Sequence, residues 1–211
     1  MKKGRLVILD KIEGRNCAAL IDDGRLTDFL VDPNTKSPRP GAIYRAQTMR
    51  PMKGQNGITL DLGAGHIGYL RNAKGVGPGE TMLVQVSTHA EGTKAAPVTP
   101  KLLFKSRYCI VTPDAPGINV ARKIRDEDER DRLLEAAHEA LHGADERLGL
   151  IVRSVSENID VDAVFQDITA MRTAAEAVMS EVSGAPALLQ KAETAAQVAW
   201  REWVDPDPDD V

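Results

Sequence analysis

The sequence has few cysteines, few aromatic residues and no long apolar run. Two of its 211 residues are cysteine and 4% are aromatic. Cys17 and Cys109 each stand alone in an apolar stretch, which argues against a disulfide framework and against a four-cysteine zinc site. No apolar run approaches the roughly 20 residues that span a bilayer, and residues 6–9 are too short for the core of a signal peptide. We therefore expect a cytoplasmic protein with no membrane partner.

The charges are distributed unevenly along the chain. Residues 1–125 carry 20 Lys and Arg against 10 Asp and Glu, a balance of +10, whereas residues 126–211 carry 7 against 21, a balance of −14. The net charge of −4 conceals this division. A basic first part predicts a surface that binds a polyanion. Chance segregation of surface charges is the alternative interpretation.

The first half of the chain is predicted to form short strands. Residues 16–21 and 25–31 flank an Asp-Asp-Gly sequence that is typical of a tight β-hairpin turn. A proline-rich segment follows, and after it come about five short strands broken by glycine turns, the last expected at residues 98–104. This pattern predicts a five-stranded barrel of the OB type over residues 41–105.

The hydrophobic period changes after residue 117 to that of helices. Three segments have this amphipathic pattern: residues 126–143, 162–182 and 193–203. We assign the buried face of the first helix to Leu134, Ala137 and Leu141, and we expect residues 149–155 to form a buried strand. The prediction is an α+β protein with an N-terminal β-hairpin region, an inserted barrel and a C-terminal α/β part with amphipathic helices.

One short motif in the first predicted helix suggests a zinc hydrolase. His138 and His142, with Glu139 between them, fit the pattern H-E-x-x-H, which places two imidazoles on one helix face. Gly143 ends the helix directly afterwards, and no third histidine follows. On a helical wheel both histidines fall on the polar side of Leu134. We therefore interpret them as surface residues and keep the zinc hydrolase as the weakest alternative.

A second group of residues, in the predicted barrel, suggests binding of nucleic acid. Tyr69 and His66 lie beside glycine turns. Cations surround them in the sequence: Arg45, Arg50, Lys53, Arg71, Lys74 and Lys94. An aromatic platform inside a cationic groove is suited to single-stranded RNA. A place for Tyr69 in the barrel core is the alternative.

A series of short segments, in the same order along the chain, resembles the ribonuclease E/G family. These segments are Ala42-Ile43-Tyr44-Arg45, Leu60-Asp61-Leu62-Gly63, Gly68-Tyr69-Leu70, Thr93-Lys94-Ala95-Ala96, Arg107-Tyr108, Thr112-Pro113, Val120-Ala121-Arg122-Lys123-Ile124 and Gly149-Leu150-Ile151-Val152-Arg153-Ser154. The resemblance implies four parts. They are an RNase H-like subdomain that starts in residues 1–40, an S1 (OB) RNA-binding barrel in 41–105, a sensor of the RNA 5′ monophosphate in 106–185, and a return to the RNase H-like subdomain with an acidic tail in 186–211.

The resemblance also assigns individual roles. Tyr69 matches a stacking aromatic of the S1 domain and Lys94 an S1 lysine, whereas the second family aromatic falls on Thr59. The positions that match phosphate contacts of the sensor are Arg122, Arg153 and Ser154, the last replacing a threonine. Both Arg and Ser can donate hydrogen bonds to phosphate oxygens.

The family cuts RNA in a later DNase I-like domain, where two aspartates hold Mg²⁺. We find no match to that domain in this sequence, so we expect no catalytic residue, metal site or cofactor in this chain. The resemblance thus implies the RNA-binding front of an endoribonuclease, as a fragment or a shortened relative. Single-stranded RNA is the expected partner, and further copies of the chain could join through absent or C-terminal regions. A stand-alone S1-type RNA-binding or adaptor protein is the alternative.

Overall fold

The computed structural model describes residues 4–51, 56–73, 75–203 and 208–209. Contacts along the chain divide it into two compact units. One unit combines Met1–Lys36 with Glu193–Val211, and the other is Ser37–Ala192. None of the described helices is both long and apolar enough to cross a membrane.

The first unit is a three-stranded antiparallel sheet with one helix on it. The strands β1 (Arg5–Ile12), β2 (Arg15–Asp22) and β3 (Arg25–Val31) pair in sequence order. The predicted hairpin is confirmed: Asp22 pairs with Arg25, and positive φ angles at the two residues between them fit a tight turn. The helix α3 (Ala195–Glu202) packs its Ala199, with Trp203 just after it, against the apolar face of β1 and β2. The acidic tail contributes Asp209, whose carboxylate accepts a hydrogen bond from the Arg5 amide at 2.5 Å.

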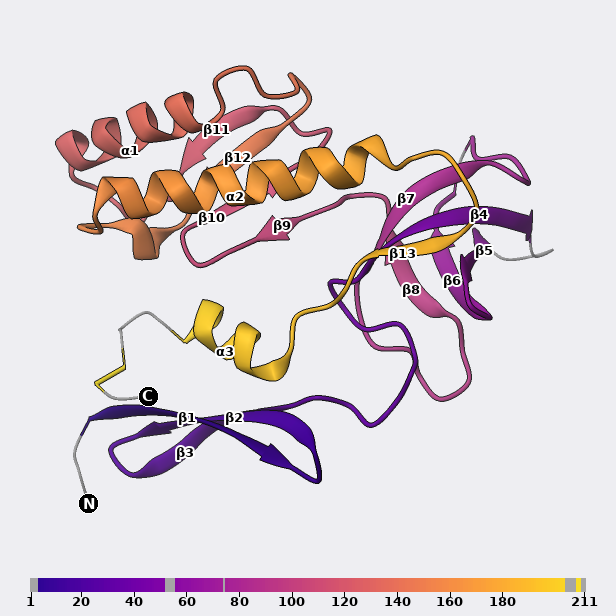
Figure 1. Cartoon of the computed structure of the whole chain (residues 1–211), viewed down its shortest axis with the longest axis horizontal. Coiled ribbons are helices and arrows are strands. Elements are labelled where there is room, and N and C mark those ends of the chain that lie inside the picture. The colour runs from indigo at the N-terminus through magenta and orange to yellow at the C-terminus, as the bar shows by residue number, and fades with distance from the viewer. Residues whose placement is uncertain (1–3, 52–55, 74, 204–207, 210–211) are drawn as a thin grey trace. The chain divides into compact units, whose positions relative to one another are not determined.

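The second unit begins with a closed barrel of five strands (Figure 1). These strands are β4 (Ile43–Pro51), β5 (Gly57–Gly63), β6 (His66–Arg71), β7 (Thr81–Val86) and β8 (Ala96–Thr99). Closure follows from the pairing of β4 with both β5 and β7, of β6 with both β5 and β8, and of β7 with β8. In β5 the apolar residues alternate with half-buried ones, because successive side chains of a strand point to opposite faces. The five-stranded barrel predicted from the sequence is thereby confirmed.

The edges of the barrel differ from the sequence prediction in two places. The last barrel strand ends at Thr99, whereas Phe104 lies in a separate strand, β9 (Phe104–Lys105), which pairs with the next sheet. A further strand, β13 (Ala187–Gln190), pairs with β4 and was not foreseen. The other boundaries of the four-part division stay predictions.

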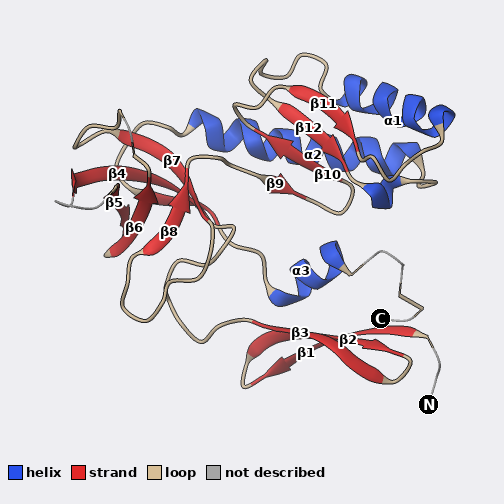
Figure 2. Cartoon of the chain, turned by 180° about the vertical axis from the view of Figure 1, so that it is seen from behind, coloured by secondary structure: helices blue, strands red, loops and turns tan. Residues whose placement is uncertain are grey.

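The rest of the second unit is a four-stranded sheet with two helices on one face (Figure 2). Its strands are β9, β10 (Cys109–Thr112), β11 (Gly117–Val120) and β12 (Gly149–Val152), and their spatial order is β11-β12-β10-β9. The helix α1 (Glu127–Ala140) joins the parallel strands β11 and β12, and α2 (Val161–Ser180) lies beside it. A short 3-10 turn, Ser154–Ser156, follows β12. The predicted α/β part with amphipathic helices is confirmed, and the whole chain is an α+β protein.

The buried face of α1 is not the predicted one. The buried residues are Leu133, Ala136, Ala137 and Ala140, whereas Leu134 and Leu141 are half-buried. The helix contains several alanines, which at helical spacing can belong to more than one apolar face. The hydrophobic period alone therefore did not identify the face that is buried. With the correct face, His138 and His142 point away from the core and are exposed, which confirms them as surface histidines. In the described part of the chain, no three His, Cys, Asp or Glu side chains lie where they could hold a metal ion.

Candidate nucleic-acid interface

Tyr69 lies on the outer face of the barrel. It pairs with Thr59 on β5 and with Pro97 on β8, and it is half-buried. Its neighbour Gly68 is buried and faces the side chains of Leu62 and Val98, so the next residue along the strand points outward. Tyr69 is absent from the buried cluster that fills the barrel, in which Tyr44 is the aromatic residue.

The Tyr69 ring reaches across β5 because one position there has no side chain. A Cβ built at Gly57 would clash with the Tyr69 phenol group. Gly57 therefore lets the ring lie against the outer surface of the strand. This placement leaves the ring half-exposed, as a stacking platform requires.

The predicted partners of Tyr69 are placed differently from one another. Arg71 is exposed on the same outward face of β6, and His66 is half-buried at the start of that strand. Lys94 is exposed just before β8, and its ammonium group donates to Glu91 at 2.7 Å. This hydrogen bond raises the pKa of Lys94 and lowers that of Glu91. Two further predicted cations, Lys53 and Lys74, lie outside the described residues, and no side chain is described for Arg50.

Arg45 serves the fold of the barrel. Its Nε donates to the Ala185 carbonyl at 2.7 Å, and its Nη1 donates to the Glu181 carbonyl and carboxylate at 2.9 and 3.0 Å. These bonds connect β4 to the end of α2 and to the segment before β13. Its role in RNA binding stays a prediction.

The residues matched to the phosphate sensor converge at the ends of two neighbouring strands. Val120 of β11 pairs in parallel with Val152 of β12, and the Ala121 amide donates to the Val152 carbonyl at 2.9 Å. Arg122 therefore follows one strand at the point where Arg153 and Ser154 follow the other. Parallel pairing thus brings together residues that lie about 30 positions apart in the sequence.

Arg153 is held by the segment that precedes β10. Its Nη1 donates to the Ser106 carbonyl at 2.7 Å, and its amide donates to the Tyr108 carbonyl at 2.8 Å. The Arg107 guanidinium lies 5.6 Å from the centre of the Tyr108 ring, within the range of a cation–π interaction. Arg153 and Ser154 are half-buried, whereas Arg122 is exposed.

A polar cluster that the sequence did not predict lies behind Arg153. Its members are Ser106, Tyr108, Cys109 and Asp167. Asp167 of α2 accepts hydrogen bonds from the Ser106 hydroxyl at 2.5 Å and from the Tyr108 amide at 3.1 Å. The Ser106 hydroxyl also lies 3.2 Å from the Cys109 sulfur. Burial, more than any charge nearby, raises the pKa of Cys109 to about 12, so the thiol is neutral at physiological pH. Because Asp167 lies about 60 positions from Ser106, no local pattern could have connected them.

Two acidic residues at the start of α1, Asp126 and Glu129, bind groups of the same helix. The Asp126 side chain caps the helix by accepting from the Glu129 amide at 2.8 Å, and the Glu129 carboxylate binds the Arg132 guanidinium at 2.7 Å. Within the described residues, no ion pair joins Arg122 to the acids of this helix. The alternative to a phosphate site, in which Arg122 and Arg153 both pair with the acids of this helix, stays a prediction.

Comparisons with known proteins bear on the predicted resemblance. The model of the Ribonuclease E/G family matches residues 104–211, about half of the chain. The chain belongs to the ribonuclease E/G family. It is 30% identical over 132 residues to Ribonuclease E of Nostoc sp., an alignment that covers 62% of this chain and 19% of that protein.

Two other relatives of this ribonuclease E/G chain are ribonucleases G. The chain is 26% identical over 165 residues to Ribonuclease G of Escherichia coli (strain K12), with 67% of this chain and 33% of the relative covered. It is 25% identical over 205 residues to Ribonuclease G of Haemophilus influenzae, with 82% and 41% covered. The chain therefore spans between about a fifth and two fifths of the length of these relatives.

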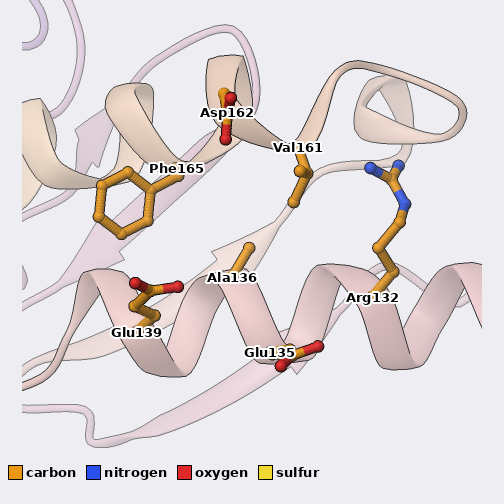
Figure 3. A pocket seen from close by; sticks show the side chains of 7 residues that line it. All are labelled: Arg132, Glu135, Ala136, Glu139, Val161, Asp162 and Phe165. Carbon is orange, nitrogen blue, oxygen red and sulfur yellow. The ribbon is translucent and has the colours of Figure 1, made fainter.

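A cavity lies between α1 and α2 of the ribonuclease E/G chain (Figure 3). Its volume is about 310 Å³, and it is lined by Arg132, Glu135, Ala136, Glu139, Val161, Asp162 and Phe165. Three of these residues are acidic, and the guanidinium of the single basic one is bound to Glu129 and to the Ile159 carbonyl. The cavity therefore has the wrong charge for a phosphate, and the candidate interface is the barrel face and the strand ends.

Proposed function

We propose that this chain is the RNA-binding part of a ribonuclease E/G-like endoribonuclease that works in RNA processing or decay in the cytoplasm. In this proposal, the outer face of the barrel binds single-stranded RNA around Tyr69. The ends of β11 and β12 bind the 5′ monophosphate through Arg122, Arg153 and Ser154. The observation that carries the proposal is the parallel pairing of Val120 with Val152, which supports a common site for these three residues.

The chemistry of these groups suits a terminal phosphate. A guanidinium presents a planar set of donors that match phosphate oxygens, and a hydroxyl adds another donor. A terminal monophosphate carries more negative charge than an internal diester, so two arginines at one place favour the end of an RNA over its interior. A 5′ hydroxyl offers no such charge.

The barrel face suits the sequence-independent part of the binding. Every base has a π-face that can stack on Tyr69, and Arg71 on the same face can neutralise the backbone. Thr59, beside Tyr69 in the register, has no ring. We therefore propose one stacking position here where the family pattern has two.

We assign RNA cleavage, and the Mg²⁺ that it needs, to a part of the longer relatives that this chain does not match. In-line attack on a phosphodiester requires fixed carboxylates to hold the metal ion. The described residues contain no group of three potential metal ligands, and Asp209 of the acidic tail is bonded to the Arg5 backbone.

The test compares matched oligonucleotides that carry a 5′ monophosphate or a 5′ hydroxyl. We expect the wild-type chain to bind the monophosphate about tenfold more tightly or better, because a hydrogen bond to a charged group contributes about 1.5–3 kcal/mol. Arg153→Ala should abolish the preference. Arg147→Ala is the matched control, because it removes the same charge just before β12 from a side chain that pairs with Asp145. Equal affinity of the wild type for both oligonucleotides would refute the proposal.

A further inference from the structure

The polar cluster behind Arg153 connects the proposed phosphate site to a helix that contributes no phosphate contact. Asp167 lies on α2, packed against the strand that carries Cys109. Its Oδ2 accepts from both the Ser106 hydroxyl and the Tyr108 amide. The carbonyls of the same two residues accept from the guanidinium and the amide of Arg153. Asp167 and Arg153 therefore bind the same short segment.

We propose that Asp167 is a positioning residue for the recognition of the RNA 5′ phosphate. It fixes the segment from Ser106 to Tyr108, and this segment fixes the guanidinium of Arg153. This inference rests on the proposed function and adds to it the residue that sets the specificity of the site. Asp167 itself does not touch the phosphate.

The segment from Ser106 to Cys109 forms a turn with its own hydrogen bonds. Because the turn is fixed, Asp167 can determine the position of the Arg153 guanidinium through it. The Ser106 amide donates to the Cys109 carbonyl at 2.9 Å, and the Cys109 amide donates back to the Ser106 hydroxyl at 3.2 Å. The Ser106 hydroxyl thus lies between the turn and Asp167. If the carboxylate is removed, this hydroxyl loses its acceptor at 2.5 Å and the Tyr108 amide loses its acceptor at 3.1 Å.

The physical consequence concerns the cost of ordering a long side chain. An arginine that is free to change rotamer must be ordered when the ligand binds, and that cost reduces affinity. An arginine that is already bonded to a fixed carbonyl avoids part of it. Asp167 should therefore affect the affinity for the 5′ phosphate and leave the affinity for the rest of the RNA unchanged.

The test measures the ratio of the dissociation constants for the 5′-hydroxyl and 5′-monophosphate oligonucleotides. We expect Asp167→Ala to lower this ratio by about two- to tenfold, the ordering cost of one long side chain, with affinity for the 5′-hydroxyl oligonucleotide within about twofold of wild type. Asp167→Asn retains an acceptor oxygen and should retain most of the ratio. Asp162→Ala, which removes an exposed carboxylate from the first turn of the same helix, should leave the ratio unchanged.

A folded Asp167→Ala protein with the wild-type ratio, or with equal losses for both oligonucleotides, would overturn the proposal. If Asp167→Ala does not fold, Ser106→Ala decides, because it removes one of the two bonds to Asp167 and leaves the carbonyl that binds Arg153. A reduced ratio in Ser106→Ala supports the proposal, and an unchanged ratio overturns it.

A second readout separates this proposal from the proposed function. In nuclear magnetic resonance spectra at low temperature, the Arg153 guanidinium should give slowly exchanging Nη–H signals in the wild type and in Asp162→Ala. These signals should be lost in Asp167→Ala, or in Ser106→Ala if the former does not fold. If the wild type shows no preference for the 5′ monophosphate, the proposed function is wrong, and these signals still decide whether Asp167 positions Arg153. Signals that persist in the decisive variant would show that it does not.

Discussion

The barrel face and the strand ends present basic groups in two different ways. On the barrel, Arg71 and Lys94 are exposed, and the Lys94 ammonium group donates to the exposed carboxylate of Glu91. At the strand ends, the guanidinium and the amide of Arg153 are both bonded to main-chain carbonyls. Mobile cations suit a ligand that takes many conformations, whereas a fixed guanidinium suits one group of defined geometry. The proposed function requires this difference, because it assigns general RNA binding to the barrel face and recognition of the 5′ end to the strand ends.

The secondary structure explains this contrast. Arg71 is the last residue of β6 and Lys94 precedes β8, and both side chains are exposed to solvent. Residues that directly follow a strand lie among the last peptide groups of its neighbours, whose carbonyls are available as acceptors. Arg153 follows β12 and faces the segment before β10. Its place at the end of a central strand therefore holds it more firmly than the exposed side chains of Arg71 and Lys94 are held.

The largest expected effect is a loss of stability when one buried leucine is replaced in either of the two cores. Leu150 and Leu60 are both fully buried, the first in the core of the four-stranded sheet and the second in the barrel core. Replacing either with alanine should lower the free energy of unfolding by about 2–5 kcal/mol, because each leaves a cavity. Thermal denaturation measures this loss.

Binding by these two variants, at a temperature where both remain folded, tests the comparison itself. Leu150→Ala should reduce the preference for a 5′ monophosphate, and Leu60→Ala should reduce affinity for both oligonucleotides. If the two variants give the same pattern, the two regions do not act separately.

The next effect concerns the stacking platform. Tyr69→Ala should weaken binding of both oligonucleotides equally, by about 1–3 kcal/mol, because one base loses its stacking partner. Fluorescence anisotropy with labelled RNA measures the loss, and circular dichroism checks the fold. A variant that unfolds while its folded fraction binds normally would show that Tyr69 stabilises the barrel and does not bind RNA.

Much of the fold could be predicted from local patterns in the sequence. The Asp-Asp-Gly turn predicted the hairpin of β2 and β3, and short apolar segments broken by glycine turns predicted the five strands of the barrel. The sequence did not predict β13, because its four residues after a proline are too few to show a hydrophobic period. Phe104 was placed in the wrong sheet because an apolar residue in a short strand does not indicate which strand it will pair with.

The candidate site could be predicted only in part, and for a physical reason. A resemblance could match Arg122, Arg153 and Ser154 to a phosphate site, but their proximity depends on the pairing of β11 with β12, which no spacing reveals. The outward direction of Tyr69 likewise depends on Gly68 facing the core. Asp167 has no signal in the sequence at all, because its partners Ser106 and Tyr108 come from a different element.

A smaller effect is expected from a variant that adds an aromatic side chain to the barrel face and so raises its affinity for RNA. Thr59→Phe places a ring beside Tyr69 on the outward face, where the family pattern has its second aromatic residue. We expect affinity for both oligonucleotides to rise by about 1 kcal/mol, the lower end of the range for one stacked base. Titration of a short unstructured RNA measures the gain. A gain confined to the 5′-monophosphate oligonucleotide would contradict the assignment of this face to general binding.

The smallest expected effect is no effect. Incubation of the purified chain with Mg²⁺ should leave a fluorescently labelled RNA intact, because the described residues offer no structured group of carboxylates to position a metal ion. Gel electrophoresis of the RNA over time is the measurement, with a mock purification as the control for contaminating ribonuclease. Metal-dependent cleavage that copurifies with the chain and exceeds this control would reveal an active site that neither region accounts for.

The central claim is that the ends of β11 and β12 recognise the 5′ phosphate. The most direct measurement follows backbone amide signals of the isotopically labelled chain by nuclear magnetic resonance as the two matched oligonucleotides are added. We predict that the 5′-monophosphate oligonucleotide shifts the signals of Arg122, Arg153 and Ser154, and that the 5′-hydroxyl oligonucleotide shifts signals on the barrel face alone. Identical shifts at the strand ends with both oligonucleotides, or none with either, would contradict the claim.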